Sequence, residues 1–340
     1  MVYNMLDIAK VDISEDEILE FDKELLDILL YDRTTNHNII WATDDYQEKG
    51  EGFAATDNII ISNITGKMFS AIIRPRSVKT SKQQRLRARS KAEVFTPSWL
   101  CNKQNNLLDE TFFGRKSVFN KESEDGWIVV QKKVSFPEGK NWKDYILNPL
   151  LEISCGEAPY LVSRYDSTTG KGIELIKRIG LLDRKFRIIS ENAATDEEWL
   201  EWSIKAIEHT YGFELQGDNL LIARENVLFT FLDYYYQRHN SLPNKKLIRR
   251  IATIISWNLW QMDGLKLVVP FSCHNTIAVE QQFNFGGDNI SSLREKILPC
   301  PGCKGGKEYS HNGIYCNIKD WDSGIIDSFI NISTNRYGKI

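Results

Sequence analysis

Residues 151–161 (LEISCGEAPYL) and residues 211–221 (YGFELQGDNLL) share one pattern, and this pattern constrains the fold more than any other feature of the chain. Each segment reads as a short apolar strand, an acidic residue at or near the end of that strand, a tight turn and then a helix. Nucleotide-type cofactors bind across the carboxyl ends of parallel strands in an open α/β sheet. The two segments therefore predict a cofactor site where two neighbouring strands end.

The alternation of strand and helix patterns along the chain predicts the fold class. Such alternation indicates an α/β protein with a mostly parallel, twisted sheet that is covered on both faces. Apolar residues at helical spacing identify the helices, and alternating β-branched residues identify strands. We expect helices over residues 14–31, 98–108, 218–235 and 245–256, and a strand pair over residues 50–74.

Composition excludes several classes of protein. The chain has 340 residues, of which 42% are hydrophobic and 26% charged, as in ordinary soluble globular proteins. Its net charge of −3 argues against coating nucleic acid over the whole surface, although a local basic face remains compatible with it. No apolar run reaches the ~18–20 residues of a membrane span, and no secretion signal opens the chain. Six cysteines are too few for a disulfide scaffold, so we expect a cytoplasmic protein without a membrane partner.

Residues 74–91 carry eight cations and no acid, which is the strongest charge asymmetry in the chain. Lysine and arginine that neutralise phosphates release counterions and give salt-dependent affinity, so this segment predicts contact with DNA. The alternative is a solvated, mobile basic loop. No aromatic residue interrupts the run, which argues against base stacking. The predicted DNA-binding residues are Arg74, Arg76, Lys79, Lys82, Arg85, Arg87, Arg89 and Lys91.

The turn at residues 155–158 (CGEA) is the first predicted cofactor element. Small residues let the backbone approach a ligand closely, and the helix that follows points its amide dipoles at the bound group. Ala158 stands where a second glycine is common in such turns, and alanine is tolerated there if its φ is negative. The alternative is a strand-turn-helix corner without a ligand.

Two further acids complete the predicted set. Glu214, at the end of the second strand, is well placed to accept hydrogen bonds from both hydroxyls of a ribose. Asp263 follows an apolar segment, residues 254–260, in a position that suits the acid receiving an adenine amino group. The alternative for Asp263 is an aspartate in a surface turn before glycine.

Three segments, taken in chain order, resemble a known family. Residues 87–97 (RARSKAEVFTP), 151–164 and 211–226 resemble the opening motifs of amino-methylating, S-adenosylmethionine-dependent DNA methyltransferases. The closest resemblance is to the modification subunits of bacterial restriction–modification systems, and it covers roughly residues 70–265. It implies a Rossmann-like methyltransferase fold, S-adenosylmethionine as cofactor, adenine N6 as the methylated position, and DNA and other restriction–modification subunits as partners.

The resemblance also implies positions for individual residues. Phe95, Thr96 and Pro97 would line the methionine end of the cofactor, and Glu214 would hold its ribose. The remaining residues would surround the methionine moiety: Glu152, Ser154, Cys155, Gly156, Glu157, Ala158 and Tyr160.

The catalytic motif of that family is missing. Amino-methylating enzymes use Asn/Asp/Ser-Pro-Pro-aromatic, whose oxygens accept both amino hydrogens while the aromatic ring stacks on the flipped base. This sequence has no Pro-Pro pair, and Asn148-Pro149 is the nearest fragment. The chain stops short of the motif, a partner chain supplies it, or the protein binds cofactor and DNA without methylating. No catalytic residue is therefore assigned.

Residues 300–316 predict a zinc site near the carboxyl end. Cys300 and Cys303 form a Cys-x-x-Cys turn, which places two thiolates on one side of a tight loop as tetrahedral zinc requires. We expect Cys316 as the third ligand and His311 as the fourth. Cys273 and His274 are alternative fourth ligands, and reduced structural cysteines are the alternative to a metal.

These observations predict three regions: an α+β extension with the basic segment at residues 1–92, a methyltransferase-like domain at 93–270 and a small Cys-rich lobe at 271–340. The expected function is S-adenosylmethionine-dependent adenine methylation of DNA, or the cofactor- and DNA-binding part of such a system. A non-catalytic DNA-binding or regulatory subunit that keeps the fold is the first alternative. A methyltransferase of small molecules or proteins is the second, and the basic segment argues against it.

Overall fold

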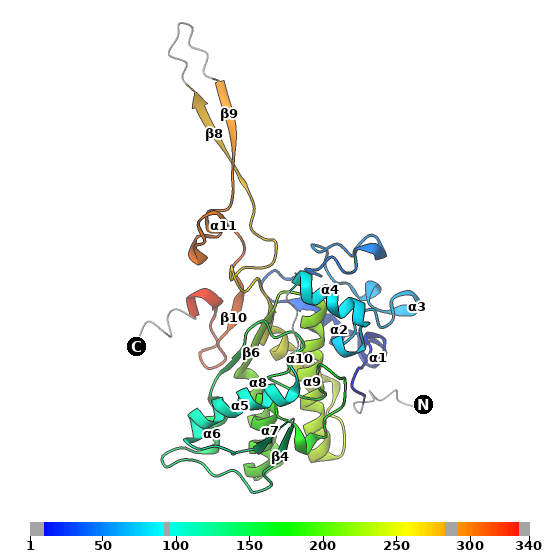
Figure 1. Cartoon of the computed structure of the whole chain (residues 1–340), viewed down its shortest axis with the longest axis vertical. Helices are drawn as coiled ribbons and strands as arrows, with labels where there is room; N and C mark the ends of the chain where they lie inside the picture. Colours follow the sequence, from blue (N-terminus) through cyan, green and yellow to red (C-terminus); the bar gives the residue numbers. More distant parts are fainter. Residues whose placement is uncertain (1–9, 92–95, 125, 283–291, 333–340) are drawn as a thin grey trace.

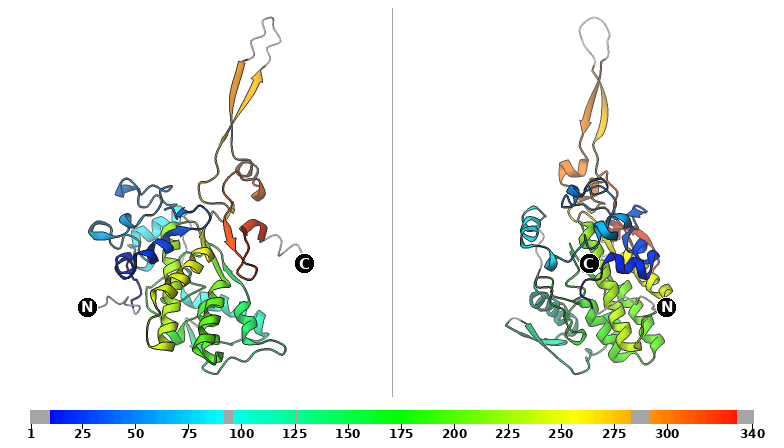
Figure 2. Two further views of the ribbon diagram at one scale, coloured as in Figure 1. Left: turned by 180° about the vertical axis from the view of Figure 1, so that it is seen from behind. Right: turned by 90° about the vertical axis from the view of Figure 1, so that its right-hand side faces the viewer.

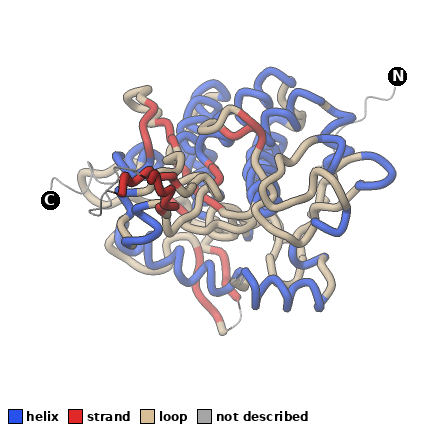
Figure 3. Tube along the Cα trace, turned by 90° about the horizontal axis from the view of Figure 1, so that it is seen from above, coloured by secondary structure: helices blue, strands red, loops and turns tan. Residues whose placement is uncertain are grey.

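The computed structural model describes residues 10–91, 96–124, 126–282 and 292–332. Its central element is a parallel sheet of three strands, β5 (Leu150–Glu152), β6 (Thr210–Glu214) and β7 (Leu259–Gln261), in the order β5-β6-β7. Mixed α/β architecture with a parallel sheet was the expectation, and the structure confirms it. The sheet is small, and Figure 3 shows that helices and loops make up most of the molecule.

Helical crossovers join the three strands, because a parallel connection must return over the sheet. Between β5 and β6 lie α7 (Leu181–Asn192) and α8 (Asp196–Glu208); between β6 and β7 lie α9 (Gly217–His239) and α10 (Lys245–Asn258). The expected helices at residues 218–235 and 245–256 are therefore confirmed. α8, α9 and α10 all pack against β6, and their apolar side chains form the main core.

The two faces of the sheet are covered by different elements. The register pairs Phe213 with Trp260, so both side chains lie on one face. That face packs against the C-terminal segment through Cys316, Ile318 and Phe329. This segment contains two short paired strands, β10 (Asn317–Lys319) and β11 (Ile326–Ser328). The long helices α8, α9 and α10 lie on the other face, whereas short strands and a helical segment that begins at Phe329 cover this one.

The N-terminal region shares the main core. Its predicted helix is interrupted at Asp22, which ends α1 (Glu15–Phe21) and caps α2 (Lys23–Leu30). The strand pair expected at residues 50–74 is wrong, because turns there bury Ile59, Ile64 and Ile73 one at a time in the core. The other short elements are β1 (Tyr31–Asp32), β2 (His37–Asn38), η1 (Gln47–Lys49), η2 (Ile61–Asn63), α3 (Gly66–Phe69), η3 (Arg76–Val78) and α4 (Ser81–Lys91).

Arg224 fixes this N-terminal region to the sheet. The residue is fully buried in α9, and its guanidinium donates to the carbonyl oxygens of Leu259 in β7 (2.8 and 2.9 Å) and of Leu29 (2.6 Å) and Tyr31 (3.1 Å). A buried guanidinium is stable only when its donors are satisfied, so these contacts specify where α2 and β1 lie.

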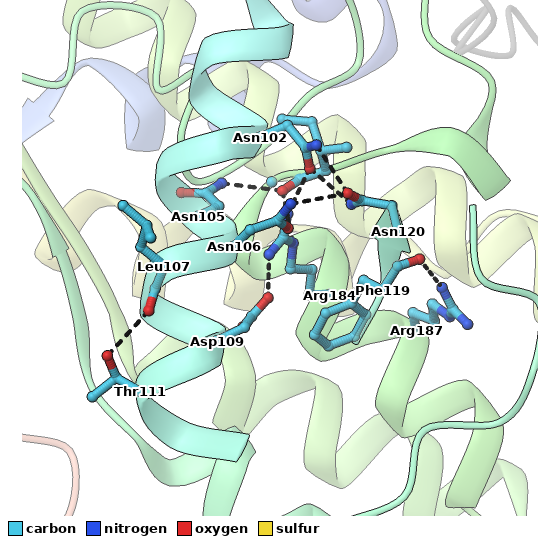
Figure 4. Close-up of polar contacts among 12 residues, drawn as sticks. Asn102, Asn105, Asn106, Leu107, Asp109, Thr111, Phe119, Asn120, Arg184 and Arg187 are labelled. Carbon is cyan, nitrogen blue, oxygen red and sulfur yellow. Dashed lines mark hydrogen bonds and ion pairs between the residues drawn. The ribbon is translucent and has the colours of Figure 1, made fainter. Parts of the chain in front are cut away.

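α5 (Ser98–Phe113) lies near the carboxyl ends of β5 and β6, and a polar network with α7 holds it there. Arg184 of α7 forms an ion pair with Asp109 and donates to the side-chain oxygens of Asn102 (2.8 Å) and Asn106 (3.0 Å), as Figure 4 shows. Arg184 is 1% exposed, so this network fixes the position of α5. Nearby elements are β3 (Asn120–Ser123), β4 (Gly126–Val129), α6 (Trp142–Leu147) and η4 (Leu175–Lys177).

A hairpin projects from the body of the molecule. Strands β8 (Thr276–Gln282) and β9 (Ser292–Leu298) pair antiparallel and stand away from the other elements in every view of Figures 1 and 2. The short helix α11 (Pro301–Gly305) and the turn η5 (Glu308–Ser310) follow at its base. Among the described residues, no helix combines the length and apolarity that crossing a membrane requires.

Candidate functional site

A cavity of about 770 Å³ lies at the carboxyl ends of β5 and β6, between these strand ends and α5. This is the position at which open parallel sheets bind ligands. The cavity brings together seven of the residues predicted to contact a cofactor, and it is lined by Thr96, Gln104, Asn105, Leu107, Leu108, Leu151, Glu152, Ile153, Ser154, Cys155, Gly156, Pro159, Tyr160, Leu181, Glu214, Leu215, Gln216 and Asn219.

Glu214 joins the two strand ends. Its carboxylate accepts hydrogen bonds from the backbone N–H of Gly156, in the turn after β5 (2.9 Å), and of Gln216, in the turn after β6 (3.1 Å). Each N–H uses a different carboxylate oxygen, and each oxygen has a second lone pair. The side chain is largely buried yet lines the cavity, so it places a carboxylate where the two strands end.

Glu152 stabilises the other side of the same turn. Its two oxygens accept from the N–H groups of Tyr160 (3.3 Å) and Leu161 (3.1 Å). Burial raises the pKa of this carboxyl to about 8; the two N–H donors oppose the rise, and the nearby charge of Glu214 adds to it. A cation bound in the cavity would favour the ionised form of Glu152.

In the turn that follows β5, three residues have the left-handed backbone conformation. Ser154, Gly156 and Ala158 have φ values of 49°, 56° and 62°. Ala158 therefore does not adopt the negative φ expected of it; it takes the conformation that glycine takes more readily, held by complete burial. The turn aims the N–H of Gly156 at Glu214.

Glu157 and Ala158 do not line the cavity, although both were predicted to contact a cofactor. Glu157 points into the protein, where its oxygens accept from the backbone N–H of Arg76 (2.5 Å) and the hydroxyl of Tyr165 (2.8 Å). Side chains along the turn point alternately towards the cavity and into the protein, and only the first group reaches the cavity.

The segment before α5 contributes less than predicted. Thr96 lines the cavity, and its carbonyl oxygen accepts from the hydroxyl of Ser167 (3.1 Å). Pro97 is the residue that precedes the first turn of α5 and does not line the cavity. Phe95 lies outside the described residues.

Asn105 is a cavity residue that the sequence analysis missed. Its side-chain amide donates to the carbonyl oxygens of Tyr160 (3.0 Å) and Ile179 (3.1 Å), so it fixes the distance between α5 and the turn after β5. The amides of Asn102, Asn105 and Asn106 at helical spacing were the available signal, because asparagine is uncommon in helix interiors unless its side chain bonds another segment.

Asp263 does not reach the cavity. Its carboxylate accepts from the N–H groups of Leu265 (3.1 Å) and Lys266 (3.3 Å) and pairs with the ammonium of Lys266 (2.9 Å). The surface-turn alternative therefore describes this residue, since the sheet ends two residues earlier and the chain turns away from the cavity.

The basic segment consists of turns up to residue 80 and then helix α4, and two of its cations are structural. Arg87 is buried and pairs with Asp218 (2.8 Å) and Asp45 (2.9 Å), while Lys79 pairs with Asp218 at 3.3 Å. Burial alone would raise the pKa of Asp218, but Arg87 and Lys79 hold it well below its usual value. These ion pairs fasten α4 to the first turn of α9.

The other cations of the segment differ in exposure. Arg76 is partly buried, and the side chain of Lys91 lies outside the described part of the chain. The remaining four side chains are exposed and form the basic surface that α4 and the preceding turn present: Arg74, Lys82, Arg85 and Arg89.

A Cys/His cluster lies at the base of the hairpin. Nδ1 of His311 is 3.4 Å from Sγ of Cys273 and 3.6 Å from Sγ of both Cys300 and Cys303. The four ligand atoms lie within 4.8 Å of one another. Sulfur and nitrogen ligands of a tetrahedral zinc lie about 3.6 Å apart when the bonds are about 2.3 and 2.0–2.1 Å long. The nitrogen–sulfur distances in this group therefore match those of a tetrahedral zinc site.

The cluster uses Cys273, one of the alternative ligands, and not Cys316. Cys316 is fully buried between the sheet and the C-terminal segment, where its thiol donates to the carbonyl oxygen of Gln261 (3.3 Å). Its burial raises its pKa, which disfavours the thiolate that a metal needs. Chain spacing suggested Cys316, but the tertiary structure brings the loop before β8 to the knuckle.

Two glycines allow this approach. A Cβ on Gly302 would lie 2.6 Å from the ring of His311, and a Cβ on Gly313 would lie 3.0 Å from Sγ of Cys273. Against the opposing effect of burial, hydrogen bonds from the N–H groups of Cys303 and Asn312 lower the pKa of the Cys300 thiol to about 6. That residue is therefore prepared to act as a thiolate ligand.

A scan of protein-family models, a search of curated proteins and a search of solved structures each found no match to this chain.

Proposed function

We propose that this chain is the S-adenosylmethionine- and DNA-binding subunit of an adenine-N6 DNA methyltransferase of the restriction–modification type. The observation that supports this most is the position of Glu214, which ends β6, lines the cavity and accepts the N–H of Gly156 from the turn after β5. A Rossmann-like methyltransferase needs an acid at this point to hold the ribose of its cofactor, and the sequence resemblance named the same residue.

The cavity fits the chemistry of the cofactor. Glu214 places a carboxylate, the type of group that accepts from ribose hydroxyls, in the cavity wall, and Glu152 offers a carboxyl whose ionised form a sulfonium cation would favour. Leu151, Pro159 and Leu181 supply apolar wall for the adenine ring and the methionine chain. When bound, the cofactor supplies an electrophilic methyl group; the residues of this chain orient it and exclude water.

Contact with DNA is the second part of the proposal. The exposed cations Arg74, Lys82, Arg85 and Arg89 supply charges that phosphates recognise. Arg87 and Lys79 are excluded from this role, because Asp218 already binds both.

The alternative is a non-catalytic DNA-binding or regulatory subunit that retains the fold. The absence of any Pro-Pro pair favours it, since without the Asn/Asp-Pro-Pro-aromatic motif no group in this chain is assigned to accept the amino hydrogens of adenine. Both functions share the cavity, and they differ only in whether methyl transfer occurs.

Calorimetric titration with S-adenosylmethionine tests the cavity. We expect binding by the wild type and about 10- to 100-fold weaker binding by Glu214→Gln, because charge-assisted hydrogen bonds contribute about 1.5–3 kcal/mol. Asp263→Asn is the matched control, and we expect its affinity to be unchanged. Absence of cofactor binding by the wild type would refute the methyltransferase proposal.

DNA binding is tested separately by its salt dependence. Replacing Lys82, Arg85 and Arg89 by glutamine should weaken binding and reduce the slope of log K against log salt, by about 0.9 for each phosphate that the variant no longer neutralises. An unchanged slope would remove this surface from the proposal. A tritiated-methyl assay, with and without the products of neighbouring genes, then distinguishes an enzyme subunit from the non-catalytic alternative.

We further propose that zinc is the resident metal of the Cys273, Cys300, Cys303 and His311 cluster and that it has a structural role. Four protein ligands complete a tetrahedral shell and leave no open position for a substrate. Elemental analysis of protein purified without added metal tests this, and we expect about one zinc per chain.

A further inference from the structure

The two edge strands of the parallel sheet, β7 and β5, differ in what lies against them. At the β7 edge, the side chain of Gln261 accepts from the N–H of Ile40 and donates to its carbonyl oxygen, both at 2.8 Å, so an N-terminal segment covers that edge. All three residues of β7 are buried. β5 is the other edge of the sheet, and no further strand pairs with it among the described residues.

At this edge, β5 has backbone N–H and C=O groups that can pair with another strand. The N–H of Leu150 donates to the carbonyl oxygen of His209, so Leu150 directs its backbone groups towards β6. Backbone groups alternate in direction along a strand, and those of Leu151 therefore face away from β6. An edge of this kind is a template for a strand from another chain.

Among the described residues, the covering of the β5 face is also incomplete. Leu151 pairs with Tyr211, so its side chain lies on the face that Phe213 and Trp260 share. The C-terminal segment covers that face over β6 and β7, yet Leu151 is 45% exposed and Ile153 70% exposed. Parallel sheets are normally buried on both faces, so the covering layer is incomplete at β5.

Exposed apolar side chains continue from β5 around the cavity. Leu107 and Leu108 of α5 and Leu215 after β6 are exposed, and they line the same cavity as Leu151 and Ile153. A contiguous set of exposed leucine and isoleucine side chains marks an interaction surface rather than a solvated one. The cavity is thus bounded on one side by apolar surface that the described part of this chain does not cover.

We infer that a partner chain adds a strand parallel to β5, covers Leu151 and Ile153, and completes the cavity at its open side. This inference rests on the proposed function, because the sequence lacks the Asn/Asp-Pro-Pro-aromatic motif whose oxygens accept both amino hydrogens of adenine. The carboxyl end of a strand added parallel to β5 falls at the cavity. A group following that strand can therefore reach the methyl donor, and the Asn/Asp-Pro-Pro-aromatic motif is the group that this chain lacks.

A second copy of the same chain satisfies fewer of these requirements. A two-fold axis beside β5 would pair the two edge strands antiparallel. Such a dimer would bring a second cavity without the missing acceptors. The partner is therefore a different chain.

Co-expression with the product of an adjacent gene that encodes the Asn/Asp-Pro-Pro-aromatic motif tests the inference. We expect a one-to-one complex, slower hydrogen exchange at the amide of Leu151, and tritiated-methyl transfer to DNA by the complex only. Ile153→Asp should abolish co-purification, because it places a charge at the centre of the interface. Leu265→Asp, at a side chain 88% exposed in the turn after β7, is the control and should leave the complex intact.

Several outcomes would overturn the inference. Two concern the isolated chain: methyl transfer without a partner, or self-association that Ile153→Asp abolishes. Two concern the partner: no complex with any gene product that carries the motif, or a complex that leaves the Leu151 amide unprotected and tolerates Ile153→Asp. Cofactor titration of the isolated wild type separates the two proposals. Cofactor binding without an edge-dependent complex refutes the partner strand alone, whereas an edge-dependent complex without cofactor binding refutes the proposed function alone.

Discussion

The cavity at the strand ends and the Cys/His cluster at the hairpin base are built in opposite ways. The cavity gathers backbone N–H groups, one carboxylate from each of two strands and a helix held by Arg184. The cluster consists of four side chains from the loop before β8 and from the segment between Cys300 and His311, which contains α11. The first depends on packing throughout the core, whereas the second would depend on the ion that we propose it binds. The two regions should therefore fail independently when either is perturbed.

The largest expected effect is the loss of the metal from the cluster. Cys303→Ser should reduce the zinc content from about one ion per chain to a small fraction, because structural zinc contributes on the order of 10 kcal/mol in small domains. Cys303 is exposed, so the substitution opens no cavity. Cys316→Ser should retain the zinc, since that thiol bonds Gln261 instead. Elemental analysis checks both, and zinc loss from Cys316→Ser would contradict the ligand set.

The second effect concerns the core beneath the cavity. Asp218→Asn leaves Lys79 and Arg87 buried with one charged partner fewer, and removing one member of a buried pair costs about 3–5 kcal/mol. Urea unfolding should show this loss while the zinc content stays unchanged. Asp196→Asn is the control: its carboxylate is 58% exposed beside Arg238, so we expect little change in stability. Equal losses in both variants would contradict the buried network.

The third effect is steric and confined to the cluster. Gly302→Ala places a methyl group 2.6 Å from the His311 ring, and overpacking of this kind costs about 1–3 kcal/mol. Zinc affinity, measured by competition with a chelator, should fall about 10- to 100-fold. Gly305→Ala is the matched control in the same helix, because its nearest neighbour, Cγ of Lys307, is 3.9 Å away. Similar affinities for the two variants would show that the knuckle is not closely packed.

The last effect is a pH dependence of the cavity region. The folded protein retains a proton on Glu152 that the unfolded chain releases, so wild-type stability falls as pH rises from about 4.5 to about 8. Glu152→Gln removes this contribution, and its stability should fall less steeply, with a difference below about 1.4 kcal/mol per pH unit. Urea unfolding at pH 5 and pH 8 measures the difference. Identical slopes for both proteins would refute the raised pKa.

Local sequence patterns predicted the elements of the cavity. An acid that ends an apolar segment and precedes a turn is a short-range pattern, and both Glu152 and Glu214 occupy the predicted strand ends. The long helices α9 and α10 followed from apolar periodicity. Asn105 was missed because its role lies in bonds to Tyr160 and Ile179, which are distant in sequence.

The composition of a segment predicted less well which of its side chains can reach a ligand. The cations of residues 74–91 look equivalent in sequence, yet Arg87 and Lys79 are bound by Asp218, which lies more than a hundred residues away. Asp263 resembles Glu214 in its setting after an apolar segment, but it bonds its own turn. In both cases a long-range or backbone partner, absent from the local pattern, decided the role.

The sequence by itself determined the parallel strands, the acids at their ends, the long helices and the Cys-x-x-Cys knuckle, because each depends on neighbours within a few residues. Only the tertiary structure decided that Cys273 rather than Cys316 joins the Cys/His cluster, that the long helices and the C-terminal segment lie on opposite faces of the sheet, and that β5 is an open edge within the described part of the chain. The physical reason is that burial and metal coordination join segments far apart in the chain, and their selection depends on which surfaces the whole fold brings together.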